Sequence, residues 1–255
     1  MKKTFAFTFL LLVLSCRDAT GPAGGESPGG TALVWFNGLS ATADIYYPEE
    51  DLLLAGAWTT GSAPNQIRTL ENRDFAVLSS LDAEMFIASA DEPGEYALRI
   101  LLPRGMNPYS FASDGSSCYV TLLLADSVIR ADLGTGQVSE GFSTRANPSG
   151  IETQGGRVFL GYGNWPDGTS PGGVSVYARE GGEEIQWLDT GVNTQTLKLQ
   201  PTGMIHCYST TYQNDGRITV IDPEGEPFIM TVINCGGAPG EAIMHGETFI
   251  SPDGW

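Results

Sequence analysis

Two histidines, His206 and His245, are the only imidazole side chains in the chain, and they are therefore its obvious candidates for a catalytic base. Nucleophilic catalysis needs such a base within hydrogen-bond reach of the attacking group. His206 lies inside an apolar run and His245 lies in a turn before Gly246, so neither is placed beside a nucleophile by the sequence. We interpret both as structural residues and predict no catalytic residue.

Cysteine thiols can form disulfides or bind a metal, and three of them lie in the body of the chain: Cys118, Cys207 and Cys235. Cys207 and Cys235 are close enough in sequence to leave a disulfide between them open. Cys118 and Cys207 fall two repeat units apart, too far for a bridge that needs Cα atoms within about 7 Å. Because no Cys-x-x-Cys pair occurs, we expect no structural zinc, and we predict no cofactor.

The fourth thiol, Cys16, follows a short apolar stretch. Lys2 and Lys3 precede the apolar run 4–14, which is shorter than the roughly 20 residues of a membrane-spanning helix. This pattern is typical of a secretory signal peptide. The tetrapeptide Val-Leu-Ser-Cys at 13–16 resembles the bacterial lipobox, which implies cleavage before Cys16 and acylation, including palmitate, of that residue. The alternative is an ordinary signal peptide with an incidental cysteine.

Three regions follow from this pattern. Residues 1–15 are expected to be the signal peptide. Residues 16–31 hold five glycines and two prolines and almost nothing apolar, so they should form a flexible, lipid-anchored tether. The folded domain is expected over 32–255. The resulting localisation is the bacterial cell envelope, on the periplasmic or the cell-surface side, with the membrane as a partner through the lipid on Cys16.

Charge excludes one class of partner. The formal net charge is −17, and loss of residues 1–15 removes two of the 13 basic residues but none of the 30 acidic ones, which leaves −19. Proteins that bind nucleic acid or anionic lipid headgroups do so through clustered Lys and Arg. We therefore expect no nucleic-acid partner.

Internal repetition is the main signal of architecture. Five segments can be aligned on a proline column, in which a threonine stands once: Pro64, Pro108, Pro148, Thr194 and Pro239. The steps between them are 44, 40, 46 and 45 residues. Within each unit, short alternating apolar runs such as 128–132, 174–177 and 218–222 are bounded by Gly, Pro and Asn turns, which is the pattern of strands. Units of this length with four strands match one blade of a β-propeller.

Two stretches carry a family resemblance. Ser-Asp-Gly-Ser-Ser-Cys-Tyr-Val-Thr at 113–121, followed by the strand and Thr-Gly turn at 126–136, resembles the YVTN-type β-propeller repeat. Residues 218–223 match the third strand of that repeat again. The opening 33–48 is similar to the first blade of surface lipoproteins that carry it. Leu122 stands where the motif has asparagine. The resemblance implies an all-β propeller of four-stranded blades over roughly 32–255.

The number of blades leaves two alternatives. Residues 32–62 supply only three strands, four fuller units follow, and a sixth begins near Ala238 and stops at Trp255. Five or six blades are therefore visible, and we expect C-terminal truncation of the propeller. In the alternative, a compact five-bladed ring uses C-terminal strands to complete the first blade.

A ligand site is expected on one face. In a propeller, the loop before each inner strand and the loop between the second and third strands share a face around the axis, and the longest insertion, 161–173, should rim it. Polar and aromatic groups on a concave face form a usual binding surface. The candidate residues are Asn107, Asn147, Tyr162, Trp165, Asp167, Tyr212 and Glu241.

Two functions remain. The first is a non-catalytic scaffold that binds an unknown protein or glycan through this face. The second is a propeller hydrolase or lactonase with a divalent cation at the channel mouth, for which Asn107, Asn147 and Glu241 would be the remnant of a calcium site. Because calcium takes six to eight oxygen ligands and only these three candidates are found, we favour the scaffold and predict no metal site.

Overall fold

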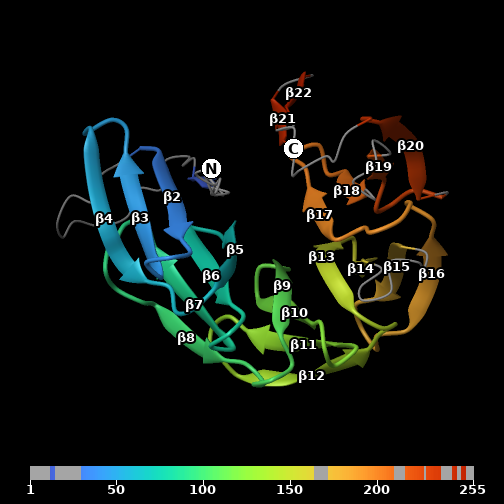
Figure 1. The fold of residues 1–255 in the computed structure, drawn as a ribbon, viewed down its shortest axis with the longest axis horizontal. Coiled ribbons are helices and arrows are strands. Elements are labelled where there is room, and N and C mark those ends of the chain that lie inside the picture. The colour runs from blue at the N-terminus through green and yellow to red at the C-terminus, as the bar shows by residue number, and fades with distance from the viewer. Residues whose placement is uncertain are drawn as a thin grey trace, which may run out of the picture. The chain divides into compact units, whose positions relative to one another are not determined.

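The computed structural model describes residues 30–163, 172–209, 216–226 and 228–236, together with three short strands outside these ranges. All regular structure in the described residues is β-strand. The strands form five four-stranded antiparallel sheets, each in sequential order, and a separate two-stranded hairpin (Figure 1). The expectation of an all-β chain built from four-stranded repeats is confirmed.

The strands are assigned to sheets in chain order. Sheet 1 holds β1 (Leu12–Leu14), β2 (Ala32–Asn37), β3 (Thr42–Tyr47) and β4 (Leu52–Thr59); sheet 2 holds β5 (Pro64–Thr69), β6 (Asp74–Ser79), β7 (Glu84–Ser89) and β8 (Leu98–Leu101); sheet 3 holds β9 (Pro108–Ser113), β10 (Ser117–Leu122), β11 (Ser127–Asp132) and β12 (Val138–Ser143); sheet 4 holds β13 (Pro148–Gln154), β14 (Arg157–Tyr162), β15 (Gly173–Ala178) and β16 (Glu184–Leu188); sheet 5 holds β17 (Thr196–Leu199), β18 (Ile205–Ser209), β19 (Arg217–Ile221) and β20 (Ile229–Asn234). The hairpin pairs β21 (Ile243–His245) with β22 (Thr248–Ile250).

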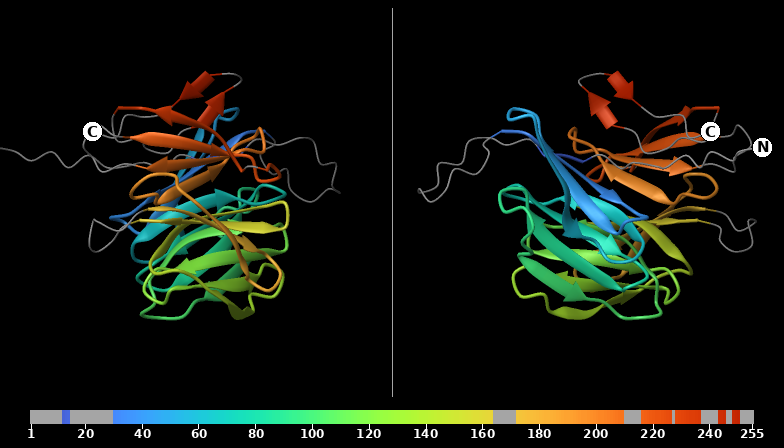
Figure 2. Two further views of the ribbon diagram at one scale, coloured as in Figure 1. Left: turned by 90° about the vertical axis from the view of Figure 1, so that its right-hand side faces the viewer. Right: turned by 60° about the vertical axis from the view of Figure 1, so that its left-hand side comes forward.

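The chain divides into two compact units, which we describe separately. Unit 1 is Met1–Pro108 with Leu133–Gln137, and it contains sheets 1 and 2. Unit 2 is Tyr109–Asp132 with Val138–Trp255, and it contains sheets 3 to 5 and the hairpin. Figure 2 shows the strands of each sheet lying side by side in two further orientations.

Within unit 1, sheets 1 and 2 share one hydrophobic core. Alternate residues of β3, namely Ala43, Ile45 and Tyr47, are buried. They pack in one cluster with buried residues of sheet 2, including Phe75. Trp58 of β4 meets the Phe75 ring edge to face at 5.0 Å between centroids. Period-2 burial on β3 thus gives sheet 1 an apolar face, which sheet 2 covers.

Within unit 2, each sheet contributes to a core with the next one. Tyr119 and Val128 of sheet 3 share a cluster with Ile151, Val158 and other residues of sheet 4. Phe159 and Val176 of sheet 4 share another cluster with residues of sheet 5, among them Ile205, Cys207 and Ile221. Sheet 4 packs against sheet 3 through Val158 and against sheet 5 through Phe159, so its strand β14 is buried at every position but the first. Since such a strand has no solvent-facing side, its sequence is mostly apolar rather than alternating.

A chain of buried hydroxyl groups joins the sheets of unit 2. Thr121 Oγ1 of sheet 3 donates to Ser149 O of sheet 4 at 2.9 Å, and Ser149 Oγ donates to Thr194 O at 3.4 Å. Thr194 Oγ1 lies 2.6 Å from Ser209 Oγ of sheet 5, which in turn donates to Thr190 O at 2.8 Å. Because each group is satisfied by a neighbour, these polar atoms can be buried between the sheets without an unpaired donor.

Several further predictions can be compared with the structure. Leu12–Leu14, within the predicted signal peptide, pairs antiparallel with Ala32–Val34, so sheet 1 has a fourth strand only through this segment. Cys207 is buried and Cys235 is exposed, and the disulfide between them that the sequence left open is not formed here. Cys118 is also buried. Among the described residues, no helix is long and apolar enough to span a membrane.

The turn between β9 and β10 depends on one carboxylate. Asp114 Oδ1 accepts hydrogen bonds from Ser117 N at 2.8 Å and from Ser116 N at 3.1 Å, and Arg179 lies 3.4 Å from Oδ2. Burial alone would raise the pKa of Asp114, but these hydrogen bonds and the arginine outweigh it and lower the pKa below its ordinary value. The charged carboxylate therefore stabilises the turn.

We predict that Asp114→Asn lowers the free energy of unfolding at pH 7 by about 1.5–3 kcal/mol, the range for hydrogen bonds to a charged group. Because the folded-state pKa lies below the unfolded one, this contribution is present at neutral pH and is lost as the pH falls through the folded pKa. Urea unfolding of both proteins at pH 7 and near pH 3 measures it. A stability difference that stays constant over this range would contradict the assignment.

Candidate functional site

Each sheet has two ends, and the predicted site lies at one of them. One end of each sheet holds the loop that leads into the first strand and the loop that joins the second strand to the third. We call this end the loop end. The opposite end, with the turns between first and second and between third and fourth strands, is the turn end. In sheet 2 the loop end contains residues 60–63 and 80–83, and the turn end contains 70–73 and 90–97.

The residue just before the repeated proline column has a left-handed backbone in every repeat where it is described. The φ angles are 55° at Ala63, 51° at Asn107, 58° at Asn147 and 55° at Asn193. Asparagine adopts this conformation more readily than other residues with a side chain. The recurrence of asparagine at this position is therefore explained by the turn, and ligand binding is not needed to explain Asn107 or Asn147.

A second set of left-handed residues lies between the second and third strands. The φ angles are 53° at Ala41, 51° at Ala83 and 48° at Asp126. Each of their carbonyls accepts a hydrogen bond from the residue that follows the fourth strand: Thr60 N to Ala41 O, Leu102 N to Ala83 O and Thr144 N to Asp126 O. The Asp126 carboxylate also accepts Asn147 N at 2.9 Å. The two loops at each loop end are thus fastened to each other.

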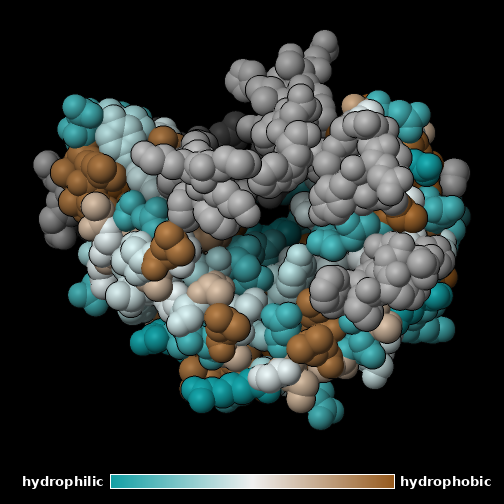
Figure 3. Space-filling model, viewed as in Figure 1, coloured by the Kyte–Doolittle hydropathy of each residue, from teal (hydrophilic) through white to brown (hydrophobic). Residues whose placement is uncertain are grey.

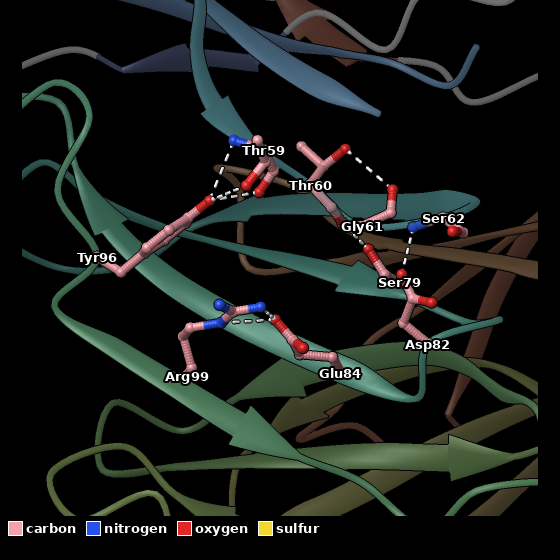
Figure 4. Close-up of polar contacts among 9 residues, drawn as sticks. All are labelled: Thr59, Thr60, Gly61, Ser62, Ser79, Asp82, Glu84, Tyr96 and Arg99. Carbon is pink, nitrogen blue, oxygen red and sulfur yellow. Dashed lines mark hydrogen bonds and ion pairs between the residues drawn. The ribbon is translucent and has the colours of Figure 1, made fainter. Parts of the chain in front are cut away.

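Figure 4 shows the loop end between sheets 1 and 2. Asp82 accepts a hydrogen bond from Ser62 N, and Ser79 Oγ donates to Thr60 O. A Cβ at Gly61 would lie 2.5 Å from Asp82 Oδ2, so the backbone must approach the carboxylate closely here. The Ser79–Thr60 contact repeats in unit 2 as Ser209 to Thr190 O. These polar groups form hydrogen bonds within the loops and thereby fix the conformation of the loops.

A different arrangement occurs at the loop end of unit 2. Tyr109, at the start of β9, donates from its hydroxyl to Gln195 Oε1 at 3.4 Å, although the two residues are 86 positions apart. Gln195 Nε2 donates to Asn193 Oδ1 at 2.6 Å. All three side chains are half-buried. We call Tyr109, Asn193 and Gln195 the carboxamide cluster; it offers neutral donors and acceptors beside an aromatic ring.

The longest insertion starts and ends at this cluster. A Cβ at Gly163 would lie 3.0 Å from Gln195 Cγ and 3.1 Å from Asn193 Oδ1. A Cβ at Gly172 would lie 2.5 Å from Asn193 N. Gly163 and Gly172 therefore both lie against residues of the carboxamide cluster, and glycine permits the close approach.

Tyr162 lies in the core rather than on the rim. It is 3% exposed, its hydroxyl is 3.1 Å from the Tyr177 hydroxyl, and its ring is 5.6 Å from that of Trp187. Burial raises the pKa of Tyr162 above its ordinary value, so the phenol stays neutral. The remaining candidates, Trp165, Asp167, Tyr212 and Glu241, lie outside the described residues.

The described residues offer little for acid–base or metal chemistry. His206 is 5% exposed, and burial lowers its pKa, so the imidazole is neutral near pH 7. Burial also raises the pKa of the Cys207 thiol, which keeps it protonated. In the described part of the chain, no three His, Cys, Asp or Glu side chains gather as metal ligands.

On the face viewed in Figure 3, hydrophobic residues form separate spots among polar ones rather than one continuous area of the coloured surface. The exposed large hydrophobic residues come from strands and turns spread along the chain, such as Leu81, Leu101 and Ile185. Single exposed hydrophobic residues are common on monomeric proteins and do not mark a docking site by themselves. The carboxamide cluster thus remains the best-defined candidate site.

Comparison with known proteins identifies the fold only. No family model matches the chain, and no curated protein matches it. Among solved structures, it is similar to a catalytically inactive virginiamycin B lyase from Staphylococcus aureus with quinupristin, at 13% identity and a TM-score of 0.64 over 88% of this chain and 75% of that one.

Two other solved structures give the same result. The chain is similar to a structure of a nidogen/laminin complex at 15% identity and a TM-score of 0.62, covering 84% of this chain and 82% of that one. It is also similar to a hydrazine synthase from Kuenenia stuttgartiensis at 14% identity and a TM-score of 0.58, over 71% of this chain and 51% of that chain. The chain thus spans about half the length of that enzyme chain. These similarities support a β-propeller-like all-β fold.

The turn role of Asn147 can be tested directly. We predict that Asn147→Gly is tolerated, because glycine adopts a φ of 58° without strain, whereas Asn147→Ala lowers the free energy of unfolding by about 1 kcal/mol. Urea unfolding of both variants measures the difference. Equal stability of the two variants would contradict a backbone role for Asn147.

Proposed function

We propose that this chain is a lipoprotein of the bacterial cell envelope whose β-propeller is a non-catalytic scaffold, binding a neutral, hydroxyl-rich partner such as a glycan at the carboxamide cluster. The observation that carries this proposal is the chemistry of the cluster. Its groups are two carboxamides and a phenol, which suit hydroxyl groups better than an anion or a cation.

The geometry of the cluster supports a site of this kind. Tyr109 lies in the first strand of sheet 3 and Gln195 directly precedes the first strand of sheet 5, so their contact depends on the stacking of three sheets. A site carried on such a stack is held in place without a loop having to close. The half-buried tyrosine supplies the flat apolar surface on which sugar rings pack, and the carboxamides supply directional hydrogen bonds.

The fold by itself favours no single role. The similar structures include a lyase and a complex between two proteins, so propeller-like chains serve both catalysis and binding. We propose that the five sheets are blades of a closed propeller of five or six blades. We also propose that acylation at Cys16 and the Gly/Pro-rich segment that follows it hold this propeller at a membrane.

A binding experiment tests the proposed site. We predict that Gln195→Ala and Tyr109→Phe each weaken glycan binding about tenfold, the loss expected for one hydrogen bond of about 1.4 kcal/mol. Binding is measured on a glycan array and then by calorimetry with the best glycan. Gln186→Ala, at an exposed position of β16, is the matched control and should bind like the unmodified protein.

Two outcomes would change this conclusion. Binding to immobilised envelope proteins but to no glycan, with the same dependence on Gln195, would make the partner a protein. Binding that does not depend on Gln195 or Tyr109 would remove the carboxamide cluster as the site.

The anchor is tested separately. We predict that protein isolated from its own envelope begins at Cys16 and carries acyl groups on that residue, which mass spectrometry of the N-terminal peptide detects. Cys16→Ser should release the protein from the membrane fraction, because no acyl chain can then be attached. An unmodified Cys16, or a mature N-terminus elsewhere, would contradict the lipoprotein assignment.

A further inference from the structure

Two polar contacts hold the residues just before β2 against sheets 1 and 2. The carbonyl of Gly30 accepts a hydrogen bond from Arg73 Nη1, and Thr31 N donates to Glu49 Oε1 at 3.2 Å. Arg73 belongs to the turn between β5 and β6, and Glu49 to the turn between β3 and β4. We call this pair of contacts the N-terminal clamp. It fixes the place at which the chain enters β2.

Arg73 is itself held firmly. Its side chain is 8% exposed, and its Nε lies 2.6 Å from Asp91 Oδ1. Asn72 and Arg73 have φ angles of 55° and 64°, so the turn is a tight, left-handed one. An arginine fixed by burial and an ion pair positions its remaining donor well, because little side-chain freedom is lost when that donor binds a carbonyl.

The glycine at position 30 is required by the same geometry. Gly30 has a φ of +117°, and a Cβ at this position would lie 2.8 Å from the Glu49 carboxyl carbon. The Glu49 pKa is lowered, first of all by the hydrogen bond from the Thr31 amide, so the carboxylate is charged at neutral pH. Both sides of the clamp thus depend on specific residues of unit 1.

The clamp lies at the turn end of sheets 1 and 2. The opposite, loop end of the same two sheets contains residues 38–41, 60–63 and 80–83. Six-residue strands separate the two ends by about 20 Å. The composition of residues 17–29 predicts a flexible chain with a root-mean-square reach of about 20 Å. If the loop end faced the lipid, this segment would have to use a span about equal to its whole root-mean-square reach to pass along the sheet, whereas with the turn end toward the lipid it spans no part of the sheet.

We propose that the N-terminal clamp orients unit 1 on the membrane, with its turn end toward the lipid and its loop end away from it. This proposal rests on attachment through Cys16. It extends the proposed function, because it leaves the loop end of unit 1 open to partners outside the membrane.

The charge of the turn end sets how closely unit 1 approaches the membrane surface. Glu49, Glu50, Asp51, Glu71 and Glu92 are exposed in the three turns there. The one basic residue of these turns, Arg73, is buried. Exposed carboxylates are repelled by anionic headgroups over roughly a Debye length, about 8 Å at physiological salt. The clamp sets which end faces the lipid, and these carboxylates keep that end from docking on an anionic surface.

The test supplies the anchor chemically, so that its outcome does not depend on natural acylation. The chain from Cys16 to Trp255, carrying Cys235→Ser, is checked for cooperative melting and coupled through Cys16 to a maleimide lipid in phosphatidylcholine vesicles. Cys118 and Cys207 are buried and do not compete for the reagent. A fluorescent amino acid is placed at position 71 or at position 81, which are exposed turns at opposite ends of β6. Energy transfer to an acceptor on the lipid headgroups is then compared between the two positions.

We expect more transfer from position 71 than from position 81. Glu49→Ala and Gly30→Ala should each remove most of this difference and should speed hydrogen exchange at the Thr31 amide. Glu50→Ala is the matched control, since it removes the same charge from the adjacent position and should leave the difference unchanged. Equal transfer from the two positions, or a difference that survives both clamp variants, would overturn the proposal. Loss of natural acylation at Cys16 would instead contradict only the proposed anchor.

Discussion

Each sheet in this protein has a face that only another sheet can cover. A four-stranded sheet of about 40 residues has too few contacts to bury its own apolar side chains, so Ile45, Phe75 and Phe159 become core residues only when two sheets meet. This requirement for stacking governs the rest of the structure. It explains why β14, in the sheet between sheets 3 and 5, is buried at every position but the first, and why the repeat unit recurs with nearly constant length.

Stacking also decides where polar groups can lie. Hydroxyl groups at the loop ends are buried between sheets, and each finds a carbonyl or a second hydroxyl in the adjacent loop, as Thr121 and Ser209 do. Left-handed residues before the first strands bring those loops within reach. The carboxamide cluster belongs to the same set of contacts: Tyr109 can reach Gln195 only because three sheets follow one another in unit 2. Scaffold and candidate site are therefore consequences of one packing arrangement.

The sequence predicts the architecture well and the site poorly, for physical reasons. Strand alternation and the proline column are local features, and Pro64, Pro108 and Pro148 each begin a first strand as expected. The role of an individual side chain depends instead on the neighbouring sheet. Tyr162 resembles a rim residue in sequence, but the packing of sheet 4 buries it. Tyr109 and Gln195 were not among the predicted site residues, although both directly follow the repeated proline column, and that shared position is the signal that could have identified them.

The most direct test of the stacking account is the stability of Gly150→Ala. A Cβ at Gly150 in β13 would lie 2.6 Å from Gln195 O and 3.0 Å from Leu197 N. Both are backbone atoms: Leu197 lies in β17 of sheet 5, and Gln195 directly precedes that strand. Since backbone cannot move aside cheaply, the account predicts a loss of about 1–3 kcal/mol in the free energy of unfolding, measured by urea denaturation. Gly38→Ala, with no atom within 4 Å of the added carbon, is the control and should change little. A Gly150→Ala protein as stable as the unmodified chain would contradict close stacking of sheets 4 and 5.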